Sequence, residues 1–244
     1  MNIDLELEKK ITYLINEFNS KNYKLVINEA IEIINNDIKI PFVFNLLGAS
    51  YASTNMHLEA IDSYQKALNL DSNNEEIFRN LGKSYSKLGE NKKAYKSFDK
   101  ANTLKPNNAD AIFGIGLLDL KNNKFQQSID KFNTVIRYNN KFFQAYYNRA
   151  IALNYIGNLS EAQNNYLEAI KINKNYYQAY NNLGSILIRI KKIHDAIKVL
   201  EKAIQIKPNY IEALTNLGVA YLEIKKYENS LYFLNKALKI DSLY

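Results

Sequence analysis

Four asparagines stand inside stretches of sequence that otherwise read as helices. They are Asn80 in IFRNLGKSYS, Asn148 in AYYNRAIALN, Asn182 in AYNNLGSILI and Asn216 in ALTNLGVAYL. Asparagine gains little in a helix interior, because its side chain competes for nearby backbone groups. Its carboxamide offers one acceptor and two donors, so a row of asparagines could pair with the C=O and N–H groups of an extended peptide. The chemistry that this pattern suggests is binding.

Residues suited to covalent, acid–base or metal chemistry are scarce. The chain of 244 residues has no cysteine, which removes disulfides, thiolate metal sites and a cysteine nucleophile. Its two histidines, His57 and His194, are distant in sequence and lie at the start of different predicted helices, so they form no pair for metal binding or proton transfer. No phosphate-binding glycine loop and no nucleophile elbow occurs. We expect no catalytic residue, metal or cofactor, and we expect both histidines at turns or on the surface.

The composition fits a soluble, helical chain. Hydrophobic residues make up 47% of it, enough for a sizeable core, and only three prolines and eight glycines interrupt potential helices. No apolar run approaches the roughly 20 residues that span a bilayer, and the opening MNIDLELEKK contains no apolar signal segment. We expect a cytoplasmic protein that does not bind membranes.

The elements that must position the asparagines repeat every 34 residues. The glycine of NNLG has equivalents at Gly48, Gly82, Gly116, Ala150, Gly184 and Gly218. A large residue follows at a fixed offset, at Tyr64, Phe98, Phe132, Tyr166, Leu200 and Leu234. Apolar positions within each repeat share one side of a first helix, A, and one side of a second, B. We expect the small residue of helix A to let the backbones approach, and the large residue of helix B to fill the space.

This pattern resembles the tetratricopeptide repeat, whose signature has L-G, then Y, then A-x3-F, A and P in 34 residues. The resemblance implies an all-α fold, a right-handed superhelical solenoid of seven helix-turn-helix repeats. We place six repeats at residues 41–74, 75–108, 109–142, 143–176, 177–210 and 211–244. A divergent capping repeat at 7–40 precedes them, after a lead of residues 1–6.

The asparagines occupy position 6 of their repeats, roughly 150° from the core side of helix A. In a superhelix with the A helices inside, positions 2, 5, 6, 9 and 13 line the concave groove. The row resembles the asparagine ladder of peptide O-linked N-acetylglucosamine transferases, and the resemblance carries over to Asn148, Asn182, Asn216 and Asn80. The row is interrupted in the other three repeats by Gly114, Leu46 and Thr12. Either the row reads a peptide backbone, or it reflects the abundance of asparagine in this sequence.

The net charge of +7 raises the question of nucleic acid. Acids and bases balance at the groove positions, so we do not expect nucleic acid there. Arg79, Lys83 and Lys87 form a basic stripe that either meets an acidic side chain of a ligand or is a solvated helix face. Tetratricopeptide clamps for chaperone tails carry a lysine at position 2. No repeat has one here, so we do not expect such a clamp.

The fourth repeat is unusual, because Asp119 replaces the repeat tyrosine and helix A contains both Gly114 and Gly116. Each glycine lowers helix propensity by about 1 kcal/mol relative to alanine. The interpretation that we favour is a locally tilted helix that exposes Asp119. The alternative is a hinge.

We predict a non-catalytic scaffold that binds an extended peptide segment of an unidentified protein in its groove. The expected groove residues are Asn80, Asn148, Asn182, Asn216, Asn181, Tyr147, Arg79, Lys83 and Lys87. Because no helix follows the last repeat, self-association through this uncapped end is a further expectation. An alternative is the substrate-recruiting arm of a larger glycosyl- or sulfotransferase, and a third is a nucleic-acid-binding helical repeat.

Overall fold

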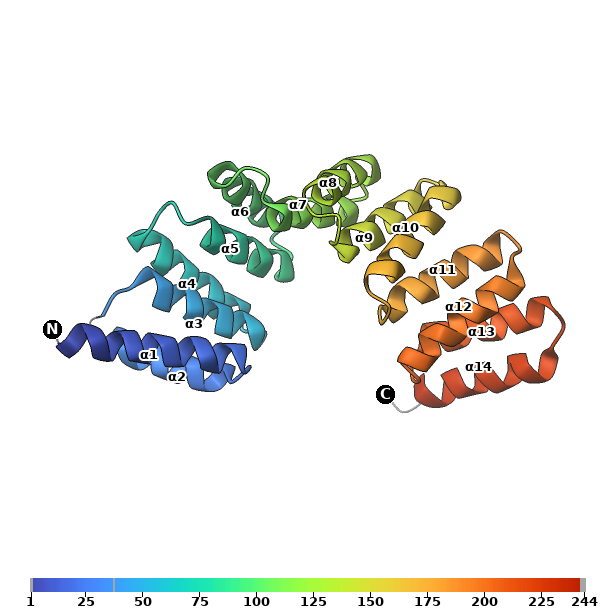
Figure 1. The fold of residues 1–244 in the computed structure, drawn as a ribbon, viewed down its shortest axis with the longest axis horizontal. Helices are drawn as coiled ribbons and strands as arrows, with labels where there is room; N and C mark the ends of the chain where they lie inside the picture. The colour runs from blue at the N-terminus through green and yellow to red at the C-terminus, as the bar shows by residue number, and fades with distance from the viewer. Residues whose placement is uncertain (1, 37, 242–244) are drawn as a thin grey trace. The chain divides into compact units, whose positions relative to one another are not determined.

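The computed structural model describes the backbone of residues 2–36 and 38–241, with side chains from residue 5 onward (Figure 1). Every regular element among these residues is an α-helix, so the predicted all-α repeat fold is confirmed. The A helices are α1 (Asn2–Asn19), α3 (Pro41–Ser53), α5 (Glu75–Lys87), α7 (Ala109–Lys121), α9 (Phe143–Tyr155), α11 (Tyr177–Arg189) and α13 (Ile211–Glu223). The B helices are α2 (Tyr23–Asn35), α4 (His57–Leu70), α6 (Asn91–Leu104), α8 (Phe125–Tyr138), α10 (Leu159–Ile172), α12 (Ile193–Ile206) and α14 (Tyr227–Asp241).

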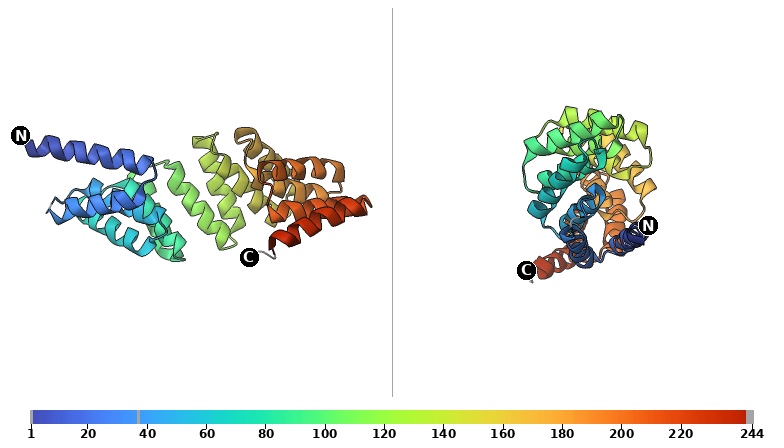
Figure 2. Two further views of the ribbon diagram at one scale, coloured as in Figure 1. Left: turned by 90° about the horizontal axis from the view of Figure 1, so that it is seen from below. Right: turned by 90° about the vertical axis from the view of Figure 1, so that its left-hand side faces the viewer.

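The chain divides into two compact units, an N-terminal unit of residues 1–118 and a C-terminal unit of residues 119–244. In the first, each helix from α1 to α5 packs against the next one along the chain. The same holds from α8 to α13 in the second unit (Figures 1 and 2). Neighbouring helices therefore bury one another's apolar sides, as expected for repeats that cannot do so alone.

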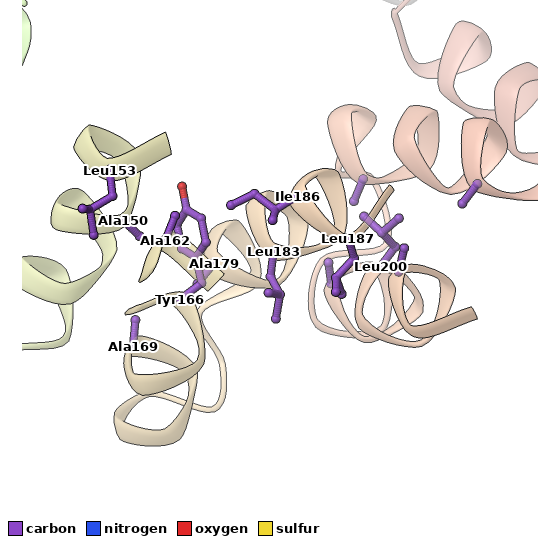
Figure 3. Close-up of a cluster of buried hydrophobic side chains, with 14 of the residues drawn as sticks. Ala150, Leu153, Ala162, Tyr166, Ala169, Ala179, Leu183, Ile186, Leu187 and Leu200 are labelled. Atoms are coloured by element: carbon purple, nitrogen blue, oxygen red, sulfur yellow. The ribbon is translucent and has the colours of Figure 1, made fainter. Parts of the chain in front are cut away.

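The helices of a pair approach closely where glycine in helix A faces a large residue in helix B. A Cβ atom added to Gly48 would lie 2.6 Å from the Tyr64 ring, and one added to Gly184 would lie 2.5 Å from Leu200 Cγ. Figure 3 labels Leu187 and Leu200 among the buried side chains in the core of the C-terminal unit. Leu200 is fully buried. The structure thus shows the small-to-large packing that the repeat pattern predicts.

All seven A–B turns contain a residue with positive φ at the same repeat position, which the sequence analysis did not identify. These residues are Lys21, Asn55, Gly89, Asn123, Gly157, Lys191 and Lys225, with φ between 59° and 82°. After each of them, the next N–H donates to the C=O five residues earlier, for example Lys226 N to Tyr221 O at 2.9 Å. This is the hydrogen bond of a Schellman cap. The left-handed conformation is therefore set by the helix pair, whatever residue occupies it.

Helix α7 contradicts one expectation. Asp119 is buried, with 4% of its surface exposed, so the prediction of a tilted helix that exposes it is wrong. Burial raises the pKa of this carboxyl group, while Lys124 and Lys131 act in the opposite direction. Gly114 also has a packing role, because a Cβ atom there would lie 2.6 Å from the Phe98 ring. The glycine leaves room for the Phe98 ring of α6, and the packing of this ring offsets the low helix propensity of glycine.

Replacing Gly184 with alanine tests the close approach. We expect Gly184→Ala to lower the free energy of unfolding by up to about 2 kcal/mol, because overpacking costs about 1–3 kcal/mol and helix propensity returns about 1. Urea denaturation followed by circular dichroism measures the change. Adding Leu200→Ala makes room for the methyl group, so the double variant should lose less stability than the sum of the single variants. Strict additivity would contradict the proposed contact.

The turns give a second prediction. Lys225→Gly should raise the free energy of unfolding by about 1 kcal/mol, because glycine adopts positive φ without the steric penalty of a Cβ atom. Thermal denaturation provides the measurement. The control is Lys225→Ala, which removes the same charge but keeps the Cβ atom and should bring no gain. Equal stabilisation by both variants would attribute the effect to charge.

Asp119 gives a prediction about pH. Because its pKa is raised by folding, the folded state binds the proton more tightly than the unfolded state, and the charged form opposes folding. The stability linked to this proton is present below the ordinary Asp pKa of about 3.9 and is lost as the pH rises through the raised value. Asp119→Asn should therefore stabilise the chain at pH 7 but bring little gain near pH 4. Denaturation curves at both pH values test this, and a gain of equal size at both would exclude the carboxyl charge as its cause.

Candidate functional site

Five polar side chains of the C-terminal unit, four of them on A helices, form a connected chain of hydrogen bonds. Asn182 Nδ2, in α11, donates to the hydroxyl oxygens of Tyr147 at 3.2 Å and Tyr166 at 3.4 Å. Asn181 Nδ2 donates to Asn182 Oδ1 at 3.2 Å, and Asn216 Nδ2 of α13 donates to Asn181 Oδ1 at 2.9 Å. We call these five residues the amide chain. It joins three successive A helices.

The asparagines at position 6 bridge neighbouring repeats by one rule. For Asn80, Asn182 and Asn216, the Nδ2 group donates to the residue 35 positions earlier, which is position 5 of the preceding repeat. Asn182 bonds to Tyr147 and Asn216 to Asn181 in this way. In the N-terminal unit, Asn80 Nδ2 donates to Asn45 Oδ1 at 3.3 Å. Sequence reasoning treated these asparagines as free groove residues, although the spacing between positions 5 and 6 was available as a signal.

Asn148 departs from this rule. Its Nδ2 group donates to the backbone oxygen of Gln144 at 2.8 Å, within α9. The residue 35 positions earlier in the sequence is Phe113, whose side chain has no oxygen. Asn148 is thus the member of the row without a side-chain hydrogen bond to another repeat among the described residues.

The amide chain, together with Asn148, keeps hydrogen-bonding groups available for a ligand. Asn181 is buried, at 6% exposure, whereas Asn148, Asn182 and Asn216 are half-buried. Among the described residues, the Oδ1 atoms of Asn148 and Asn216 accept no hydrogen bond. The Tyr147 oxygen accepts from Asn182, which leaves its own proton free to donate. Burial raises the pKa of Tyr147, so the phenol stays protonated at neutral pH.

Aromatic rings continue from the amide chain along the same unit. Tyr147 contacts Tyr176, with ring centroids 4.8 Å apart, and Tyr177 contacts Tyr210 at the same distance. The Lys207 ammonium lies 4.8 Å from the Tyr177 ring centroid and 5.3 Å from that of Tyr210. Burial raises the pKa of Tyr210 to about 12. These rings offer flat apolar surface beside neutral hydrogen-bond donors.

The three residues of the basic stripe on α5 differ in whether they form ion pairs. Arg79 NH1 lies 3.0 Å from Asp110 Oδ2, and its NH2 lies 3.8 Å from Glu76 Oε1. Lys83 and Lys87 form no ion pair among the described residues. Burial of the ammonium group, followed by the charge of Arg79, lowers the pKa of Lys83. The stripe therefore has one neutralised end and two available cations.

Groups that could support catalysis or metal binding are sparse in the described part of the chain. No cluster of three His, Cys, Asp or Glu residues occurs there. His194, near the start of α12, is exposed, as predicted. His57, the first residue of α4, is half-buried, and its Nδ1 atom is buried without a hydrogen-bond partner. None of the described helices has the length and apolar character required to cross a membrane.

Solved structures show where this fold recurs. A tetratricopeptide repeat protein from Parabacteroides merdae is 19% identical, with a TM-score of 0.72 over 96% of this chain and 92% of that one. YrrB, described as a TPR protein with an unusual peptide-binding site, is 22% identical, with a TM-score of 0.61 over 74% of this chain and 93% of its own. The Cut9-Hcn1 assembly gives a TM-score of 0.78 at 15% identity over 93% of this chain and 45% of the matched one. These likenesses show the fold.

Family models identify the repeats themselves. A TPR repeat model matches residues 48–89, and two tetratricopeptide repeat models match residues 76–108 with 143–176, and residues 175–242. No curated protein matches the chain in sequence. Together the family matches cover residues 48–108 and 143–242, more than half of the chain, which therefore belongs to the tetratricopeptide repeat family.

Proposed function

We propose that the chain is a non-catalytic scaffold whose C-terminal unit binds an extended peptide segment of a partner protein. The proposed surface is formed by the outward sides of α9, α11 and α13. Tetratricopeptide repeat proteins are scaffolds for protein–protein interaction. The peptide-binding site named for YrrB supports this use of the fold. So does the resemblance of the asparagine row to the ladder of peptide O-linked N-acetylglucosamine transferases.

The observation that carries the proposal is the amide chain. Its hydrogen bonds fix Asn181, Asn182 and Asn216 in place, so their side chains lose little conformational entropy when a ligand binds. The unused oxygens of Asn148 and Asn216 can accept from peptide N–H groups, and the Tyr147 hydroxyl can donate to a peptide C=O. A carboxamide or phenol makes these bonds with any sequence, because the peptide backbone is common to all.

The dimensions of the repeat suit an extended ligand. Packed helices lie about 8–10 Å apart, and an extended peptide advances about 3.3–3.6 Å per residue. Successive A helices would therefore meet the ligand about every third residue. The neighbouring rings of Tyr176 and Tyr177 would contact side chains that lie between these points. In the N-terminal unit, the proposed peptide-binding residues are Asn80, Arg79, Lys83 and Lys87.

A comparison of two triple variants tests the proposal. Asn148→Ala/Asn182→Ala/Asn216→Ala removes the outward amides, whereas Asn164→Ala/Asn229→Ala/Asn235→Ala removes three exposed asparagines from B helices of the same unit. We expect specific partners to be lost from lysate pull-downs, read by mass spectrometry, only with the first variant. Each lost ligand hydrogen bond should weaken binding severalfold, since such a bond contributes about 0.5–1.5 kcal/mol.

The control for folding is a denaturation curve of each variant. The first variant also loses the bonds from Asn182 and Asn216 to their neighbours, so some loss of stability is expected. Pull-downs are compared at a temperature at which circular dichroism shows both variants folded. Retention of the same partners by both variants would refute the proposed surface.

A further inference from the structure

A pocket of about 320 Å³ lies within the N-terminal unit. Helices α1, α3, α4 and α5 contribute to its lining. Phe18, Ala49 and Ala52 supply apolar surface, and Tyr64 adds a ring. Its polar lining comes mostly from α4 and α5, with Ser53 from α3. The pocket therefore joins apolar and polar chemistry in a volume suited to one or two side chains.

Two buried polar atoms on this lining have no hydrogen-bond partner among the described residues. They are Ser84 Oγ and His57 Nδ1, and Ser84 is 1% exposed. Ser50, at the equivalent position of the preceding repeat, donates to the Leu46 backbone oxygen at 2.9 Å. Ser84 makes no such bond, so its hydroxyl group remains available. Because buried polar groups are almost always paired, these atoms indicate a place for a polar ligand.

The charge of the pocket indicates the kind of ligand. Lys83 and Lys87 both line it, one helical turn apart on α5, and none of its described lining residues is a carboxylate. The nearby acids Glu76 and Asp110 pair with Arg79 instead. Two like charges at this spacing repel each other, and an anion between them would remove that repulsion. Burial also disfavours the charged form of Lys83, which a bound anion would stabilise.

We propose that this pocket binds a carboxylate side chain of a partner protein together with an adjacent apolar residue. The carboxylate lies between Lys83 and Lys87 and accepts a hydrogen bond from Ser84, while its apolar neighbour contacts Phe18. Lysine ammonium groups act as point charges, and the anionic group that an unmodified protein segment carries is the carboxylate. Arg79, whose guanidinium fork would bind carboxylates and phosphates alike, is already paired with Glu76 and Asp110. This inference rests on the proposed peptide-binding function but uses residues of the other unit.

The two histidines allow a direct test by NMR, because His57 lines the pocket and His194 lies exposed in the C-terminal unit. The probe is the blocked peptide acetyl-Leu-Glu-Leu-Glu-amide, with the Gln-for-Glu and phosphoserine-for-Glu peptides as comparisons. We expect the glutamate peptide to shift the imidazole C–H signals of His57 in a saturable way and to leave those of His194 in place. The glutamine peptide should bind at least about tenfold more weakly, as expected for loss of charge-assisted contacts.

Matched variants test the residues. Lys83→Ala/Lys87→Ala should weaken binding of the glutamate peptide by about tenfold or more, whereas Lys92→Ala/Lys96→Ala, two exposed lysines with the same spacing on α6, should not. Ser84→Ala should weaken binding and yet raise the unfolding temperature of the free protein, because it removes an unpaired buried hydroxyl group. If Ser84 had only a structural role, its replacement would not both weaken peptide binding and raise the unfolding temperature.

Three results would overturn the inference. They are unchanged His57 signals at millimolar peptide, equal binding of the glutamate and glutamine peptides, and binding of the phosphoserine peptide alone. Failure here is distinguishable from failure of the proposed function, which is read from Asn148, Asn182 and Asn216 in the C-terminal unit. Partners lost with that triple variant, combined with silent His57 signals, would refute only the pocket.

Discussion

The close approach of helix A to helix B within each repeat is the constraint on which the other features depend. Four glycines at position 8 face a large side chain of helix B: Gly48 faces Tyr64, Gly82 faces Phe98, Gly184 faces Leu200 and Gly218 faces Leu234. This contact fixes the rotation of helix A about its own axis, because the glycine must point at helix B. Once that rotation is fixed, positions 5 and 6 point toward neighbouring A helices, and the asparagines can bridge successive repeats.

The A–B turns show the same constraint acting on the backbone. Lysine and asparagine adopt positive φ at Lys21, Asn55 and Lys225 just as Gly157 does. For a residue with a Cβ atom, this conformation costs about 1–2 kcal/mol, so local preference alone would not produce it. Burial of the paired helices outweighs this penalty, and the Schellman hydrogen bond satisfies a carbonyl group that the helix end leaves open. Tertiary packing, repeated every 34 residues, therefore determines the local geometry.

The parts of the structure that follow from periodicity could be predicted from the sequence, whereas the parts that depend on particular neighbours could not. Registered glycines and large residues specify the helix pairs, because apolar patterning sets which sides are buried. A helical wheel gives the direction of Asn182 but not its distance from Tyr147, so the amide chain was missed. Burial of Asp119 was also missed, because a carboxylate in the core opposes the usual preference for exposed charges.

The use of the asparagines for stability does not exclude a role in binding. A carboxamide has two donors and one acceptor with two lone pairs, and a bond between repeats uses only part of this capacity. Asn216, for example, donates to Asn181 while its own oxygen accepts nothing among the described residues. The amide chain is neutral, so its contacts with a ligand depend little on ionic strength. The pocket beside Lys83 is cationic, so salt screens its attraction for a ligand. The two units thus present surfaces of different chemistry on one repeated scaffold, and a partner protein that satisfied both would carry an uncharged extended segment and a separate acidic one.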